Sequence, residues 1–262
     1  MGITIGLAGK GGTGKTTLAG LAIQYLARKG RTPILAVDAD SNANLNEVLG
    51  IKFDATLSEA REEMKRSAGQ VSITKDMLIE MRVNEALVET SDFDLIVMGR
   101  PEGPGCYCAA NTVLASVLEK LLDNYPYLVI DNEAGMEHLS RLTTKKVDVF
   151  YVVSDASRRG LTAAIRIWHL VDELKIKTGA KHLILNQVRG RVSPDLLAEI
   201  EKEGLVLSGV IPEDDQIYEW DQTGRPTSRL DPDNPAVAAA YAIFDQTLDH
   251  NLADLERAAG KK

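Results

Sequence analysis

The chain has 262 residues and a formal net charge of −8 at pH 7, with 44% hydrophobic and 26% charged residues. This composition is typical of a folded globular protein and excludes a largely disordered chain. The acidic balance argues against nonspecific binding to nucleic acid, and no apolar run is long enough to cross a bilayer. Because the N-terminus also lacks the layout of a signal peptide, we expect a cytoplasmic protein with no nucleic-acid and no membrane partner.

Short β-branched segments alternate with helical patterns, which predicts an α/β fold with a mostly parallel central sheet flanked by helices. The predicted strands cover residues 3–8, 33–37, 95–98, 127–130, 149–153, 182–185 and 205–211. The predicted helices cover residues 15–29, 112–122, 161–175, 194–203 and 235–258. The charged insert 56–90 is interpreted as peripheral helices, so residues 1–262 are expected to form a single domain. The order of the strands is left open.

A glycine-rich loop, G-K-G-G-T-G-K-T from Gly9 to Thr16, directly follows the first predicted strand and fits the pattern G-x-x-x-x-G-K-[ST]. Its glycines let the backbone turn with positive φ and bring N–H groups close to phosphate oxygens, and the next helix adds its N-terminal partial charge. In this context Lys15 reaches the β- and γ-phosphates and Thr16 coordinates Mg²⁺. A glycine turn without a ligand is the alternative. The pattern predicts a P-loop NTPase that binds ATP or ADP with Mg²⁺ through Gly11, Gly12, Thr13, Gly14, Lys15, Thr16 and Thr17.

A second lysine, Lys10, lies early in this loop. The pattern K-G-G-x-G-K-[ST] resembles the deviant Walker A, or signature-lysine, class of P-loop ATPases. That class includes the MinD and ParA positioning ATPases, the nitrogenase iron protein and several metal-centre maturation ATPases. The resemblance implies ATP hydrolysis by a homodimer in which Lys10 of one subunit reaches the phosphates bound to the other. A solvated loop lysine is the alternative.

Carboxylates end two of the predicted strands, and the carboxyl ends of parallel strands line the ligand crevice of such sheets. By similarity to the class, Asp40 orients or deprotonates the attacking water and Asp38 assists near Mg²⁺. Asp131 ends an apolar strand in the form of a Walker B motif and would hold the water shell of Mg²⁺, while Gly135 would offer a backbone N–H near the γ-phosphate. The expected catalytic residues are Lys10, Lys15, Asp40 and Asp131.

A third polar residue, Asn186, ends the predicted strand 182–185 and resembles the residue that reads the adenine edge in this class. The turn that follows the next strand would add backbone contacts to the base through Pro212, Glu213 and Asp214. An asparagine that caps the following helix is the alternative.

Cys106 and Cys108 are the only cysteines of the chain. In extended backbone, residues two apart project to the same side, so both sulfurs can face one partner. A closed Zn²⁺ site takes about four N or S ligands, and a two-fold axis between two copies would double the two thiolates of one chain. Two buried small side chains, or a redox pair strained by its single intervening residue, are the alternatives.

The Cys-Tyr-Cys loop, together with Lys10, Lys15 and the segment Asp-Asn-Glu-Ala-Gly at 131–135, resembles the CooC/AcsF-type ATPases over residues 1 to about 245. These ATPases assist nickel insertion into carbon monoxide dehydrogenase or its acetyl-CoA synthase partner. The resemblance implies that Cys106 and Cys108 bind Ni²⁺ or Zn²⁺ at the dimer interface, with one of these two enzymes as the client. Ser41 departs from the proline expected after Asp-x-Asp.

Two other functions stay open at this level. Four thiolates from a dimer also suit an iron–sulfur cluster, which would make the chain an iron–sulfur carrier or reductase of the same ATPase class. A MinD-like or ParA-like positioning ATPase would need a basic amphipathic tail or a basic face, and both the C-terminal segment, with Asp245, Asp249 and Asp254, and the net charge are acidic.

Overall fold

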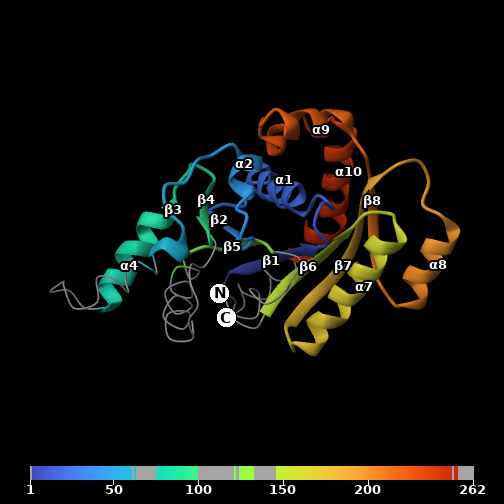
Figure 1. The fold of residues 1–262 in the computed structure, drawn as a ribbon, viewed down its shortest axis with the longest axis horizontal. Helices are drawn as coiled ribbons and strands as arrows, with labels where there is room; N and C mark the ends of the chain where they lie inside the picture. Colours follow the sequence, from blue (N-terminus) through green and yellow to red (C-terminus); the bar gives the residue numbers. More distant parts are fainter. Residues whose placement is uncertain are drawn as a thin grey trace.

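The computed structural model describes residues 2–60, 62, 75–99, 121, 124–132, 146–249 and 251–252. Its centre is an eight-stranded sheet in the order β3-β4-β2-β5-β1-β6-β7-β8 (Figure 1). All neighbouring strands run parallel except β3 and β4. The strands are β1 (Ile3–Gly9), β2 (Ile34–Asp38), β3 (Leu87–Val88), β4 (Phe93–Val97), β5 (Tyr127–Asp131), β6 (Lys146–Ser154), β7 (Lys177–Val188) and β8 (Leu207–Pro212). The mostly parallel α/β fold is confirmed.

Helices cover both faces of this sheet (Figure 1). The described helices are α1 (Lys15–Arg28), α2 (Leu45–Leu49), α4 (Lys75–Ala86), α7 (Arg158–Glu173), α8 (Pro194–Lys202), α9 (Asp215–Gln222) and α10 (Pro235–Phe244), with the 3₁₀ turn η1 (Thr227–Arg229) and the π-helical turn η2 (Asp245–Asp249). One core cluster joins the sheet to α1 and α10, and a second joins its other face to α7 and α8.

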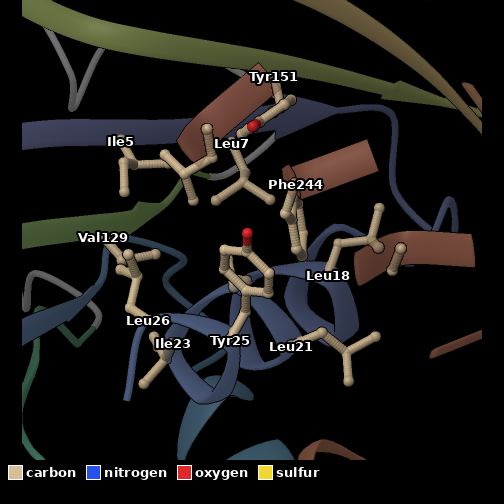
Figure 2. Close-up of a cluster of buried hydrophobic side chains, with 14 of the residues drawn as sticks. Ile5, Leu7, Leu18, Leu21, Ile23, Tyr25, Leu26, Val129, Tyr151 and Phe244 are labelled. Carbon is tan, nitrogen blue, oxygen red and sulfur yellow. The ribbon is translucent and has the colours of Figure 1, made fainter. Parts of the chain in front are cut away.

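Successive side chains of the central strands point to opposite faces of the sheet, so each strand contributes to both cores. On β6, Tyr151 belongs to the α1–α10 side and the adjacent Phe150 to the α7 side, and both are fully buried. A strand buried on both faces is what parallel sheets require. Figure 2 shows Tyr25 of α1 and Phe244 of α10 in the same cluster as Leu7 and Tyr151, and the ring centroids of Tyr25 and Phe244 are 5.5 Å apart. On the other face, Trp168 of α7 is buried beneath the Lys181 ammonium.

Polar side chains cap the N-termini of α7, α8 and α10. Ser157 accepts from Gly160 N–H at the start of α7, and Ser193 accepts from Leu196 N–H at the start of α8. Asn234 accepts from the N–H groups of Ala236 and Val237 at the start of α10. These caps satisfy backbone donors that a helix leaves unpaired in its first turn.

Several predicted boundaries are wrong. β7 begins at Lys177 instead of residue 182, and α7 begins at Arg158 instead of residue 161. The predicted helix 235–258 changes to a π-helical turn after Phe244, where the Thr247 hydroxyl donates to the carbonyl of Ile243 at 2.7 Å. The insert contains α4 as expected, but it also contributes the short edge strand β3. Most of the predicted helix 112–122 lies outside the described residues.

Within the described part of the chain, no helix is both long enough and apolar enough to span a membrane.

Gly9 at the end of β1 leaves no room for a side chain, because a Cβ there would lie 2.2 Å from the carbonyl oxygen of Val153 on β6. We expect Gly9→Ala to push these paired strands apart and to lower the free energy of unfolding by about 1–3 kcal/mol. Gly11→Ala is the matched control, since a Cβ there meets nothing within 4 Å, and its effect should stay below about 0.5 kcal/mol. Urea denaturation without nucleotide measures both, and equal losses would contradict the steric explanation.

Candidate functional site

The glycine-rich loop lies at the carboxyl end of β1, between the neighbouring strands β5 and β6. Gly12 and Gly14 have φ of 81° and 80°, the left-handed conformation predicted for such a loop. The buried Thr13 closes the turn, because its hydroxyl donates to the carbonyl of Lys10 at 2.8 Å. Lys15 begins α1 and is only 6% exposed, so its ammonium is held inside the site while Lys10 is exposed.

Asp131 and Asp38 lie side by side, since they are register partners on β5 and β2. Asp131 is 1% exposed, and neither of its carboxylate oxygens has a hydrogen-bond partner among the described residues. Burial raises its pKa to about 7; the Thr16 hydroxyl and the Lys15 charge oppose this, while the Asp38 charge adds to it. A buried, unpaired carboxylate beside a threonine hydroxyl fits Mg²⁺, which binds proteins through a few oxygen ligands and retains several waters.

Asp38 has a different environment. Its two oxygens accept backbone N–H groups, Oδ1 from Asp40 at 3.0 Å and Oδ2 from Leu45 at 2.9 Å. Burial raises its pKa to about 6, and these backbone hydrogen bonds oppose the rise. The side chain therefore fixes the loop that carries Asp40 and the start of α2, while its predicted role near Mg²⁺ stays a prediction. Asp40 is half-buried and lines the pocket.

Asn186 ties the end of β7 to the phosphate loop. Its Nδ2 donates to the carbonyl of Thr13 at 2.9 Å, and a Cβ on Gly14 would lie 2.3 Å from the same nitrogen. The φ of 80° therefore favours glycine at position 14, and a side chain there would also have to displace the Asn186 amide. Beyond it, the Arg189 Nη2 donates to Glu213 Oε1 at 2.7 Å, which joins the ends of β7 and β8 beside the pocket.

These elements surround a pocket of about 740 Å³. Most predicted nucleotide-binding residues line it, namely Gly11, Gly12, Gly14, Lys15, Thr16, Thr17, Asp40, Asn186, Pro212, Glu213 and Asp214. Lys10, Thr13, Asp38 and Asp131 lie outside the lining. Gly135, Cys106 and Cys108 lie outside the described residues. Among the residues that are described, no group of three or more His, Cys, Asp or Glu side chains could hold a metal ion.

The structure adds lining residues that the sequence did not indicate. Gln187 lines the pocket and has a φ of 56°. It lies at a register shift between β7 and β8, which no sequence pattern predicts. Tyr218 and Arg225 come from α9 and the turn after it, and the Arg225 guanidinium stacks on the Trp220 ring with 4.0 Å to its centroid. The N-cap Asp214, whose side chain accepts from Ile217 N–H, is the one sequence signal for α9.

This arrangement is suited to phosphoryl transfer, in which a protein contributes mainly positioning and charge stabilisation. The loop glycines and Lys15 line the pocket, where their N–H groups and ammonium would surround phosphate oxygens, and Asp40 lines the same pocket, where it could orient a water molecule. Thr16 and Asp131 would hold Mg²⁺, which would supply positive charge that stabilises the phosphates during transfer. The site therefore defines a P-loop nucleotide hydrolase.

The family follows from the sequence comparison: the chain belongs to the CobQ/CobB/MinD/ParA nucleotide binding domain family, whose model matches residues 5–227. An uncharacterized ATP-binding protein of Methanocaldococcus jannaschii is 43% identical over 94% of this chain and 98% of its own length. The carbon monoxide dehydrogenase accessory protein CooC of Rhodospirillum rubrum is 29% identical over 87% of this chain and 90% of its own.

Among solved structures, the septum site-determining protein MinD of Pyrococcus horikoshii with Mg-ADP has a TM-score of 0.67 and 23% identity, covering 94% of this chain and 96% of that one. The likeness confirms the fold. The chain is an ATPase of the MinD/ParA class, and its site is a nucleotide-binding site.

Asp131→Asn should stabilise the nucleotide-free protein in alkaline buffer, because it removes a buried, unpaired charge. The folded pKa of about 7 exceeds the ordinary 3.8, so the contribution of this carboxyl to stability is full below about pH 4 and is lost as pH rises through 7. The gain in Tm over wild type should therefore be larger at about pH 8 than at about pH 5, which differential scanning calorimetry measures. A lower Tm at both pH values would show that the carboxylate is paired in the free protein.

Proposed function

We propose that this ATPase is a metallochaperone that binds Ni²⁺ or Zn²⁺ through Cys106 and Cys108 of two copies. In this proposal it assists nickel insertion into carbon monoxide dehydrogenase or its acetyl-CoA synthase partner. The observation that carries the proposal is the Cys-Tyr-Cys sequence in a chain related over most of its length to CooC, a carbon monoxide dehydrogenase accessory protein. Thiolates are good ligands for borderline metals, and one chain offers only half of a closed site.

The position of the cysteines in the chain supports a link to the nucleotide. They lie in the connection from β4 to β5, the two strands that flank β2. At its start, Met98 N–H donates to the carbonyl of Asp38 at 2.9 Å, and Cys106 follows eight positions later. A change at Asp38 and Asp40 would therefore reach this connection through one hydrogen bond. By linkage, a metal whose affinity depends on nucleotide must alter nucleotide affinity by the same factor.

The exposure of Lys10 supports the dimer. Lys15 is buried within the phosphate site of its own chain, whereas Lys10 is exposed and makes no ion pair with any described residue. An exposed lysine at the edge of a phosphate site can place its positive charge beside the phosphates of a nucleotide bound to a second copy. Two copies paired across their nucleotides would each supply the lysine that the other lacks.

Lys10→Ala should reduce ATP hydrolysis by about 10²–10³-fold, the cost of one transition-state donor, while ATP affinity of the monomer changes little. Asp40→Ala should also be inactive. When the two variants are mixed, a heterodimer contains one site with Asp40 intact and Lys10 supplied by the other subunit, so activity should return. Phosphate release measures it, with each variant alone as the control. Failure of the mixture to recover activity would place Lys10 in its own site and remove the dimer from the mechanism.

Replacing both cysteines, Cys106→Ala with Cys108→Ala, should abolish binding of Ni²⁺ or Zn²⁺ and the metal-dependent dimer but leave ATP binding intact. Metal content per dimer by mass spectrometry, and mass by light scattering with ATP, with ADP and without nucleotide, measure these effects. The unsubstituted chain should also activate nickel-free carbon monoxide dehydrogenase or acetyl-CoA synthase in a nickel- and ATP-dependent manner. Unchanged metal-dependent dimers in the double variant would overturn the proposal. A brown iron–sulfur chromophore after anaerobic purification would replace it with the iron–sulfur carrier.

A further inference from the structure

Helix α7 begins with two adjacent arginines, Arg158 and Arg159, in a chain whose net charge is −8. Both residues are exposed, and neither forms an ion pair with any described residue. The first turn of α7 contains no acidic residue. Positive charge is unfavourable at this end of a helix, because the backbone N–H groups there already carry partial positive charge. A local conflict of this kind is typical of a functional surface, and it indicates that an anionic group meets the two arginines.

The two arginines lie beside the phosphate loop. β1 and β6 are parallel neighbours in which Gly9 and Val153 are register partners, and Lys10 directly follows Gly9. After β6 the chain turns into α7 at once, and the Asp155 carboxylate holds this turn by accepting from Ser157 N–H at 2.9 Å. Lys10 and the start of α7 therefore emerge from adjacent strands at the carboxyl edge of the sheet. A second copy that meets Lys10 comes near the arginines as well.

The nucleotide pocket carries an excess of negative charge. Among the described residues that line it, two are cationic, Lys15 and Arg225, and five are acidic, Asp40, Glu47, Glu213, Asp214 and Asp221. Glu213 is paired with Arg189, and Asp214 caps α9. Glu47 of α2 and Asp221 of α9 are exposed and form no ion pair with the described part of the chain; we call these two residues the acidic rim. Because carboxylates here repel the phosphates of an incoming nucleotide, nucleotide binding alone does not explain them.

We propose that Arg158 and Arg159 of one copy pair with the acidic rim, Glu47 and Asp221, of a second copy. The proposal rests on the dimer of the proposed function, in which Lys10 reaches the phosphates bound to the other chain, and it does not involve the cysteines. Two copies that each carry a charge of −8 repel one another as they approach. These contacts, which a two-fold axis produces twice, oppose that repulsion by placing positive charge against negative charge at the interface.

Reversing both charges, Arg158→Glu with Arg159→Glu, tests the contact. The protein is freed of Ni²⁺ and Zn²⁺ and supplied with Mg²⁺ and the non-hydrolysable ATP analogue AMP-PNP. The dissociation constant of the dimer should rise about 10–100-fold over that of wild type, because each ion pair occurs twice and becomes a repulsion. Sedimentation equilibrium measures this constant, and an unchanged Tm of the monomer shows that the variant folds.

Arg166→Glu with Lys177→Glu is the matched control. Both residues are exposed without an ion pair to any described residue, one in the middle of α7 and one at the start of β7, away from the carboxyl edge of the sheet. The change in net charge equals that of the arginine variant. This control should dimerise like the wild type.

A second variant exchanges the charges on the other side of the contact. Glu47→Lys with Asp221→Lys should also dimerise weakly on its own. In a mixture with the arginine variant, both contacts of the heterodimer join opposite charges, so its dissociation constant should return to within about threefold of the wild-type value.

A wild-type chain that stays monomeric with AMP-PNP would overturn the dimer and this contact together. A wild-type dimer that the arginine variant retains, an equal loss in the control, or a mixture no tighter than its two components would overturn this contact and leave the dimer standing. If the arginine variant retains the dimer but no longer activates carbon monoxide dehydrogenase, the arginines bind the client enzyme and the proposal is wrong.

Discussion

Two carboxylates held side by side under the phosphate loop are the constraint on which the rest of the site depends. The sheet order puts β5 between β1 and β2, so Asp131 and Asp38 share one register position at the carboxyl end of the sheet. Asp38 is satisfied by backbone N–H groups, but Asp131 has no hydrogen-bond partner among the described residues. The folded protein thus holds a buried carboxyl group whose charged form a cation would stabilise, and a ligand that brings that cation stabilises the fold that it binds.

Single hydrogen bonds connect the segments around these carboxylates to one another. Asn186 of β7 holds the phosphate loop through Thr13, Asp38 holds the first turn of α2, and Met98 at the exit of β4 holds the carbonyl of Asp38. The segments that begin at Asn186, Leu45 and Met98 are therefore each one hydrogen bond away from the phosphate loop or from the end of β2. Interfaces of this kind change between discrete arrangements more readily than they deform.

Much of the fold follows from local sequence signals. The sequence itself shows the β-branched strands, the glycine-rich turn and the capping serines, through residue type and spacing. The α/β class and the phosphate loop are therefore predictable. Strand order is not, because register between β1, β5 and β2 depends on packing of segments distant in sequence. α9 is short and has no fully buried residue, although Ile217 and Trp220 pack partly buried against the core, and β3 has only two residues. The sequence analysis did not identify Thr227 and Gln187 as pocket residues, because the pocket that they line is formed by elements distant in the sequence.

The two tryptophans of this chain lie in different environments, so their fluorescence can respond differently to a bound nucleotide. Of its two tryptophans, Trp168 is buried in the core on the α7 face, under the Lys181 ammonium. Trp220 sits on α9 and is capped by Arg225, a residue of the pocket wall. A nucleotide that draws the guanidinium away would alter the emission of Trp220 and leave that of Trp168 as an internal reference. In that case the fluorescence of unlabelled protein would report whether the pocket is occupied.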